Sequence, residues 1–157
     1  MTRHLLVASA CAALAAALGA RRLRRKIAVV TVRGLSMQPA LHAGDRLLIR
    51  RVRAADRLRA GQIVVIERPD AGGGPAGGPP SWPPAGHDWL VKRVAALPGE
   101  PTPAVMLAAT APGAEPVVPA GTLAVLGDNL SVSHDSRVFG YVASDRVLGV
   151  MIRALPG

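Results

Sequence analysis

After residue 26, most apolar residues fall in short blocks rich in Val, Ile and Leu, separated by turns that contain Gly, Pro or Asp. Blocks of this length and composition are typical of β-strands. The pattern predicts strands at residues 27–32, 46–50, 62–66, 90–97, 105–107, 123–126, 138–141 and 147–152. Almost no stretch after residue 27 has a helical period, so the sequence predicts a mainly β, compact, barrel-like domain.

Residues 5–20 form a continuous uncharged run, LLVASACAALAAALGA. As a helix it would span about 24 Å, slightly less than a bilayer core of about 30 Å. Three interpretations compete: a retained membrane anchor, a cleaved signal peptide and a buried helix. The basic segment RRLRRK that follows is unlike the start of a secreted mature chain and favours the anchor. We therefore predict one N-terminal transmembrane helix at 1–26, with its basic flank, and one domain at 27–157.

The orientation of this anchor is a separate question. The basic residues after the run outnumber Arg3 before it. By the positive-inside tendency, these charges would leave the following domain in the cytoplasm. They therefore oppose an extracytoplasmic placement of that domain.

Residues 69–88 include the low-complexity segment PDAGGGPAGGPPSWPP. A segment rich in Gly and Pro without periodicity is typical of a flexible surface insertion. Trp82 lies within it, and two interpretations stand equally for this ring: packing back onto the domain or contacting a substrate.

The formal net charge of +9 is concentrated at residues 21–26 and 46–59. Basic residues beside an apolar segment attract anionic lipid, although a basic stripe also suits phosphate. An aromatic content of 3% argues against a stacking surface for single-stranded nucleic acid. With Cys11 as the single cysteine, no intrachain disulfide or thiolate metal cluster forms. No metal-ligand spacing and no phosphate-binding glycine loop is present, so we predict no cofactor.

Ser36 is the candidate nucleophile, because it lies in a turn directly after a predicted strand. A serine hydroxyl is a weak nucleophile and needs a neighbouring base. Lys92 fits that role if burial among apolar neighbours lowers its pKa from about 10.4 toward about 7 to 8. Strand alternation would direct Lys92 into the core and leave Arg93 in water. The alternatives are a lysine that extends to solvent and a histidine triad using His42 or His134.

Four ordered segments carry a family resemblance: SMQPAL at 36–41, GDRLLI at 44–49, KRV at 92–94 with PGE at 98–100, and GDN at 127–129 followed by Ser133, Asp135, Ser136, Arg137 and Gly140. Together they resemble the type I signal peptidases, the Ser/Lys proteases of the S26 family. The resemblance is stronger to short bacterial and mitochondrial inner-membrane members than to larger forms. It runs from about residue 32 to residue 142, and four segments in order are far more specific than one.

The resemblance implies a role for each matching residue. Ser36 corresponds to the nucleophile and Lys92 to the general base. Ser133 corresponds to a serine that orients the lysine amine, and Asp135 with Arg137 to an ion pair that supports the site. Asp128 either joins this polar network or is simply a turn residue, since Gly-Asp-Asn is also favourable turn chemistry.

The oxyanion hole departs from the pattern of many relatives, which carry a hydroxyl residue where this chain has Gly34. The Ser36 backbone N–H is then the remaining donor, and loss of one donor costs about 3 kcal/mol of transition-state stabilisation in other proteases. The resemblance also implies that Met37, Gln38 and Pro39 lie at the substrate.

The implied function is a membrane-bound serine endopeptidase that removes signal peptides from exported precursors after small residues. Its partners would be those precursors and membrane lipid, with no nucleic acid, at a cell membrane crossed once. Two alternatives remain open: a maturation protease of the same family dedicated to one precursor, and a non-catalytic basic protein at the membrane surface.

Overall fold

The computed structural model describes residues 26–52, 58–69, 82–84, 89–109, 111 and 113–155. The strands in this part of the chain are β1 (Ile27–Thr31), β2 (Arg46–Arg51), β3 (Ile63–Glu67), β4 (Trp89–Ala96), β5 (Thr122–Leu126), β6 (Val142–Ala143) and β7 (Val147–Leu155). The helical elements are α2 (Ala104–Ala108), α3 (Ser136–Phe139) and a short 3₁₀ turn, η2 (Ser144–Arg146). The mainly β prediction is therefore confirmed.

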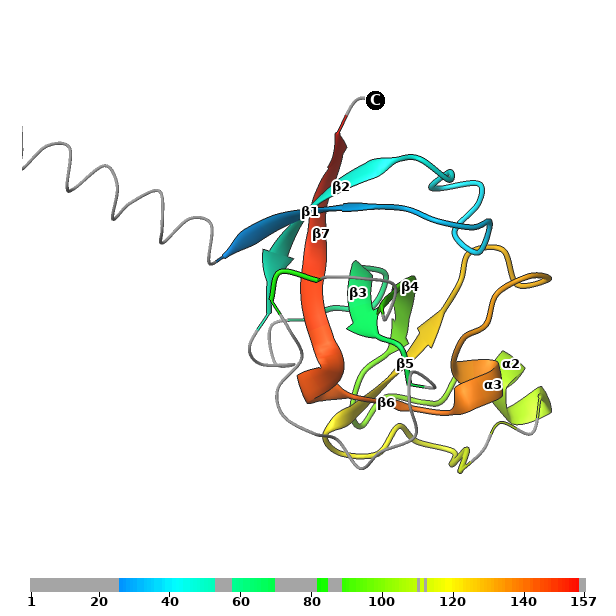
Figure 1. Cartoon of the computed structure of the whole chain (residues 1–157). Coiled ribbons are helices and arrows are strands. Elements are labelled where there is room, and N and C mark those ends of the chain that lie inside the picture. Colours follow the sequence, from blue (N-terminus) through cyan, green and yellow to red (C-terminus); the bar gives the residue numbers. More distant parts are fainter. Residues whose placement is uncertain are drawn as a thin grey trace, which may run out of the picture.

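All seven strands belong to one curled sheet in the order β1-β2-β7-β3-β4-β5-β6, and each pairing is antiparallel. The long strand β7 pairs with β2 and then with β3, so it links the two ends of the sheet (Figure 1). Curling places the loop after β1 near the middle of β4, because Lys92 Nζ of β4 donates a hydrogen bond to Ser36 Oγ of that loop.

Buried aliphatic side chains form three clusters, and alternate residues of β3 belong to the first and the second, so these two lie on opposite faces of that strand. The first joins β1, β2 and β7 to Met37 and Leu41 of the loop after β1. The second joins β3, β4, β5 and β7, and the third packs α2 against β4 and β5. The loop that carries Ser36 is thus fixed by the same core that fixes the sheet.

Two predicted strands are wrong: residues 105–107 and 138–139 are helical, and residues 140–141 belong to no helix or strand. Residues 105–107 lie in α2, where Pro103 precedes a run of good helix formers and Met106 is buried. Residues 138–139 belong to α3, whose N-cap Asp135 accepts a hydrogen bond from the Arg137 backbone N–H. The short apolar blocks matched the strand pattern, but proline and a capping aspartate decided the local structure.

The predicted transmembrane helix falls on residues outside the described ones, apart from Lys26. Within the described ranges, no helix has the length and apolar character needed to cross a bilayer. Most of the 69–88 insertion also lies outside the described residues. Trp82 within it is described: it packs against the first core cluster, with the Arg51 guanidinium 5.7 Å from its ring centroid. Of the two interpretations, the structure favours packing back onto the domain.

Candidate active site

Ser36 lies in the turn that connects β1 to β2. Met37 beside it is 1% exposed and anchors the turn in the core. Its carbonyl oxygen accepts a hydrogen bond from the Leu41 backbone N–H at 2.9 Å. The Ser36 carbonyl oxygen accepts another, at 3.0 Å, from Asn129 of the loop after β5. The turn is therefore held from both sides, and the Ser36 side chain is directed toward β4.

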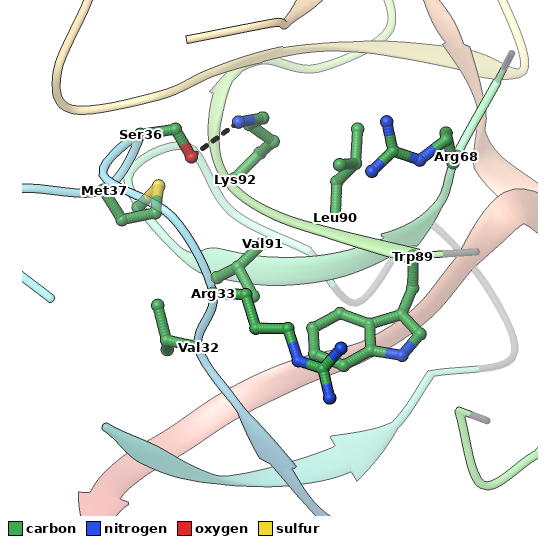
Figure 2. Close-up of a pocket in the computed structure, with 9 residues that line it drawn as sticks. All are labelled: Val32, Arg33, Ser36, Met37, Arg68, Trp89, Leu90, Val91 and Lys92. Carbon is green, nitrogen blue, oxygen red and sulfur yellow. Dashed lines mark hydrogen bonds between the residues drawn. The ribbon is translucent and has the colours of Figure 1, made fainter. Parts of the chain in front are cut away.

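Lys92 approaches Ser36 from the middle of β4. It pairs with Val64 of β3, and only 2% of its surface is exposed. Its Nζ donates to Ser36 Oγ at 2.9 Å and to Ser133 Oγ at 3.1 Å. Figure 2 shows the first of these bonds. The structure therefore brings together three side chains that are far apart in the sequence.

The pKa of Lys92 is lowered from the ordinary 10.5 to about 8, chiefly because burial disfavours the ammonium form. The Asp135 carboxylate opposes this by raising the pKa, while the positive charges of Arg68 and Arg137 lower it further. At pH 7 about a tenth of the lysine is then a neutral amine, and this form can accept a proton.

Asp135 and Arg137 lie behind Ser133 and form the predicted ion pair. Arg137 Nε donates to Asp135 Oδ1 at 2.8 Å, and the Gly127 backbone N–H donates to Oδ2 at 3.0 Å. Burial alone would raise the pKa of Asp135, but hydrogen bonds from Arg137, Gly127 and Ser133 bring it below its ordinary value. A charged carboxylate therefore holds the Ser133 hydroxyl on the side away from Lys92.

Gly127 marks a very close approach between this network and the Ser36 turn. A Cβ at this position would lie 2.5 Å from the Ser36 carbonyl oxygen and would overlap the Ser133 side chain. Only glycine lets the two segments come this close without displacement.

Asp128 does not join the Ser133 network and instead pairs with Arg93. Arg93 Nε and Nη2 donate to its two carboxylate oxygens at 2.7 and 2.6 Å, while Arg93 Nη1 donates to the Gly61 carbonyl oxygen. The pKa of Arg93 is raised, mainly by the hydrogen bond with Asp128. Asp128 is therefore more than a turn residue, but it belongs to a second polar group on the other face of β4.

Gly34 has a backbone φ of +76°, in the left-handed region that favours glycine. A Cβ there would meet no atom within 4 Å, so backbone conformation rather than space explains the residue. A residue with a hydroxyl group at position 34, as in many relatives, would have to adopt this backbone conformation, which serine disfavours.

A pocket of about 120 Å³ opens beside the Ser36–Lys92 hydrogen bond (Figure 2). Its lining residues are Val32, Arg33, Ser36, Met37, Arg68, Trp89, Leu90, Val91 and Lys92. Of the predicted substrate residues, Met37 lines the pocket, whereas Gln38 and Pro39 do not.

Arg33, Arg68 and Trp89 also line the pocket, and no pattern in the sequence indicated this. Arg68 follows β3, and Trp89 begins β4, which pairs with β3. The long insertion between the two strands hides this register in the sequence. Arg93 was expected to stay in water, and its pairing with Asp128 had no sequence signal, because 35 positions separate them.

The histidine alternative finds no support in the contacts of Ser36. Within the described residues, the hydrogen bond to its hydroxyl comes from Lys92. The His134 ring packs near Phe139, with centroids 5.5 Å apart, and the His42 backbone N–H donates to Asp45.

Comparison with known proteins adds an independent observation. The family described as "Signal peptidase, peptidase S26" matches residues 3–105 and 102–154. Among solved structures, a signal peptidase I from Enterococcus faecalis V583 is similar, with 22% identity and a TM-score of 0.40. The similarity covers 60% of this chain and 96% of that one. No curated protein matches the chain.

Proposed function

The chain belongs to the signal peptidase family, peptidase S26, and on that premise we propose that it is a membrane-bound serine endopeptidase with a Ser36/Lys92 dyad. Its substrates are exported precursors, from which it removes signal peptides after small residues. The observation that carries the proposal is the 2.9 Å hydrogen bond between Ser36 Oγ and the buried Lys92 Nζ.

In the proposed reaction, the neutral amine of Lys92 takes the proton from Ser36 Oγ as this oxygen attacks the scissile carbonyl carbon. The resulting ammonium group gives the proton to the leaving amine nitrogen, so the C–N bond breaks and an acyl-serine remains. The amine then removes a proton from water as this water attacks the ester carbon, and the resulting ammonium returns the proton to Ser36 Oγ as the bond between Oγ and the acyl carbon breaks. Each step needs Nζ within hydrogen-bond distance of Oγ.

Ser133 is proposed to orient Lys92. Its hydroxyl accepts a hydrogen bond from Nζ, and it also hydrogen-bonds to the Asp135 carboxylate. Because that carboxylate is held by Arg137 and Gly127, the hydroxyl has a fixed direction. Lys92 therefore has little rotational freedom to lose when it reacts, which favours catalysis by pre-organisation.

The proposed oxyanion donor is the Ser36 backbone N–H. Among the described residues, no acceptor is bonded to this group, so it is available to a substrate oxygen. Gly34 supplies no hydroxyl, and no atom lies within 4 Å of the position that a Cβ would take there. Stabilisation of the oxyanion then relies on one protein donor and the substrate's own contacts.

The size of the pocket suits part of a bound peptide better than a whole small molecule. Ligand pockets for whole small molecules usually have volumes of about 300 to 1,000 Å³. A volume of about 120 Å³ next to Ser36 admits one or two side chains of a bound peptide instead.

The test uses the full-length chain in detergent and a peptide whose leader ends in Ala-x-Ala. We expect cleavage after the second alanine by the parent, and loss of cleavage in Ser36→Ala and Lys92→Ala. Lys26→Ala is the matched control, since Lys26 is exposed and lies outside the pocket. Equal cleavage by the parent and both dyad variants would show that the dyad assignment is wrong.

We further propose that residues 1–26 anchor the chain and that the domain lies on the extracytoplasmic side, where signal peptides are removed. The basic residues at 21–26 oppose this orientation by the positive-inside tendency. A reporter fused after Gly157 decides the matter: activity restricted to exported reporters supports the placement, and strong cytoplasmic activity contradicts it.

A further inference from the structure

Arg68 lies just beyond the end of β3, on the wall of the pocket beside the dyad. In the β3–β4 pairing, Val64 is opposite Lys92 and Ile66 is opposite Leu90. Strand alternation places Arg68 on this same face, one step further along. In Figure 2 its side chain points toward Leu90, which lies between Arg68 and Lys92 in this view.

The pocket wall is rich in positive charge and has no carboxylate. Arg33 and Arg68 line it beside Lys92, which acts as a neutral amine in the proposed reaction, and none of the other lining residues is acidic. The nearest carboxylate in the sequence, Glu67, is engaged elsewhere, because it accepts a hydrogen bond from Arg146 at 2.6 Å. Within the described residues, no acidic side chain forms an ion pair with Arg68.

The position of the pocket limits what such a wall can bind. Because Ser36 and Lys92 form part of the lining, an occupant during the reaction must belong to the peptide being cut. The anionic groups of an unmodified peptide are carboxylates, and a guanidinium group binds a carboxylate through two parallel hydrogen bonds. The pocket is also small enough for only one or two side chains.

We propose that Arg68 binds an Asp or Glu side chain of the substrate, so that the enzyme prefers precursors with an acidic residue close to the cleaved bond. The inference rests on the proposed peptidase function and adds a charge requirement to it. Arg33 adds a second positive charge to the same wall, and Arg68 is the residue that determines specificity.

The dependence of cleavage on substrate charge distinguishes this role from a purely structural one. Arg68 is only partly buried, so its replacement creates no large cavity. Its contribution must therefore depend on the charge of the substrate. A structural role would change cleavage of all peptides alike, whereas a binding role changes the ratio between acidic and neutral peptides.

The experiment measures kcat/KM of the full-length chain for peptide pairs that differ only in Glu or Gln. The substituted position is the middle residue of Ala-x-Ala or one of the two residues after the cleaved bond, so that both alanines are kept. At one position or more, we expect the parent to prefer Glu by about tenfold, which corresponds to about 1.4 kcal/mol. In Arg68→Gln, the same ratio should fall to within about twofold of unity.

Arg153→Gln is the matched control, because it removes an equal charge from an exposed site on β7, outside the pocket. It should keep the parent's ratio, and Arg68→Lys should keep part of it. Equal cleavage of Glu and Gln peptides by the parent at every position would overturn the inference and leave the peptidase function standing. A preference that survives in Arg68→Gln would also overturn it. If the parent cleaves no peptide of either kind, the proposed function itself fails.

Discussion

Two neighbouring cations on β4 lie in opposite environments. Lys92 is 2% exposed and donates to two hydroxyl groups, whereas the Arg93 side chain is 35% exposed and donates to both oxygens of Asp128. The pKa of Lys92 is lowered to about 8, and the pKa of Arg93 is raised. We call these environments the lysine face and the arginine face of β4.

One strand therefore carries a candidate general base on one face and a structural ion pair on the other. On the lysine face, burial without a directly bonded carboxylate makes the neutral amine accessible, which a general base requires. On the arginine face, a direct carboxylate and partial exposure keep the charge fixed, and the ion pair ties β4 to the loop after β5. Strand alternation alone creates the separation, because consecutive side chains point to opposite faces.

The largest expected effect comes from Lys92→Met, which keeps an unbranched side chain of similar volume but removes the amine. We expect kcat/KM to fall by about a thousandfold or more, measured by peptide cleavage. Stability at pH 7 should not fall, because a buried base with a lowered pKa destabilises the folded protein below that pKa. The parent's unfolding free energy should rise from about pH 8 toward pH 10.5, and the variant should lack this rise.

Asp135→Asn tests the support behind the lysine face. The buried carboxylate accepts hydrogen bonds from Arg137 and Gly127, and loss of its charge should lower the unfolding free energy by about 3 kcal/mol. Because the folded pKa of Asp135 is depressed, the parent should lose this stability as pH falls below the ordinary value of 3.8. Urea titrations at several pH values measure both, and equal acid sensitivity of parent and variant would contradict the assignment.

The pH dependence of kcat/KM in the parent tests the lowered pKa of the lysine face. Since Lys92 must be neutral to act, kcat/KM should rise about tenfold per pH unit below its pKa and level off above about 8. A pH–rate profile from pH 5 to 10 provides the test. A midpoint near the ordinary lysine value of 10.5 would leave Ser36 without a base.

Gly127→Ala tests the close approach between the Ser36 turn and the Ser133 network. The added methyl group would meet the Ser36 carbonyl oxygen and the Ser133 side chain, so we expect a loss of about 2 kcal/mol in stability. Activity should fall as well, because the methyl group displaces both partners of Lys92. Unchanged thermal unfolding and cleavage would show that the segments tolerate more separation than the geometry indicates.

The smallest effect is expected on the arginine face. Asp128→Asn and Arg93→Gln should each lower stability by about 1 kcal/mol or less, because Arg93 is partly exposed to water. Cleavage rates should change by less than about threefold. A double-mutant cycle measures the coupling energy between Arg93 and Asp128. A value well above about 1 kcal/mol would contradict the expected small contribution of the arginine face.

Much of the site was predictable from sequence because its signals are local. Ser36, Lys92 and Ser133 each lie in a short recognisable segment, and the apolar neighbours of Lys92 already indicated burial. The helical segments α2 and α3 were mistaken for strands, because short apolar blocks do not distinguish helix from strand. A proline and a capping aspartate carried the correct signal.

Sequence alone therefore determined a β-rich domain, the family, and the chemical groups that could act as nucleophile and base. Tertiary structure decided which groups meet. Strand register brought Arg68 to the pocket and Asp128 to Arg93, across an insertion and 35 positions respectively. The physical reason is that periodicity specifies which face a side chain occupies, whereas the partner on that face depends on how the sheet curls and pairs.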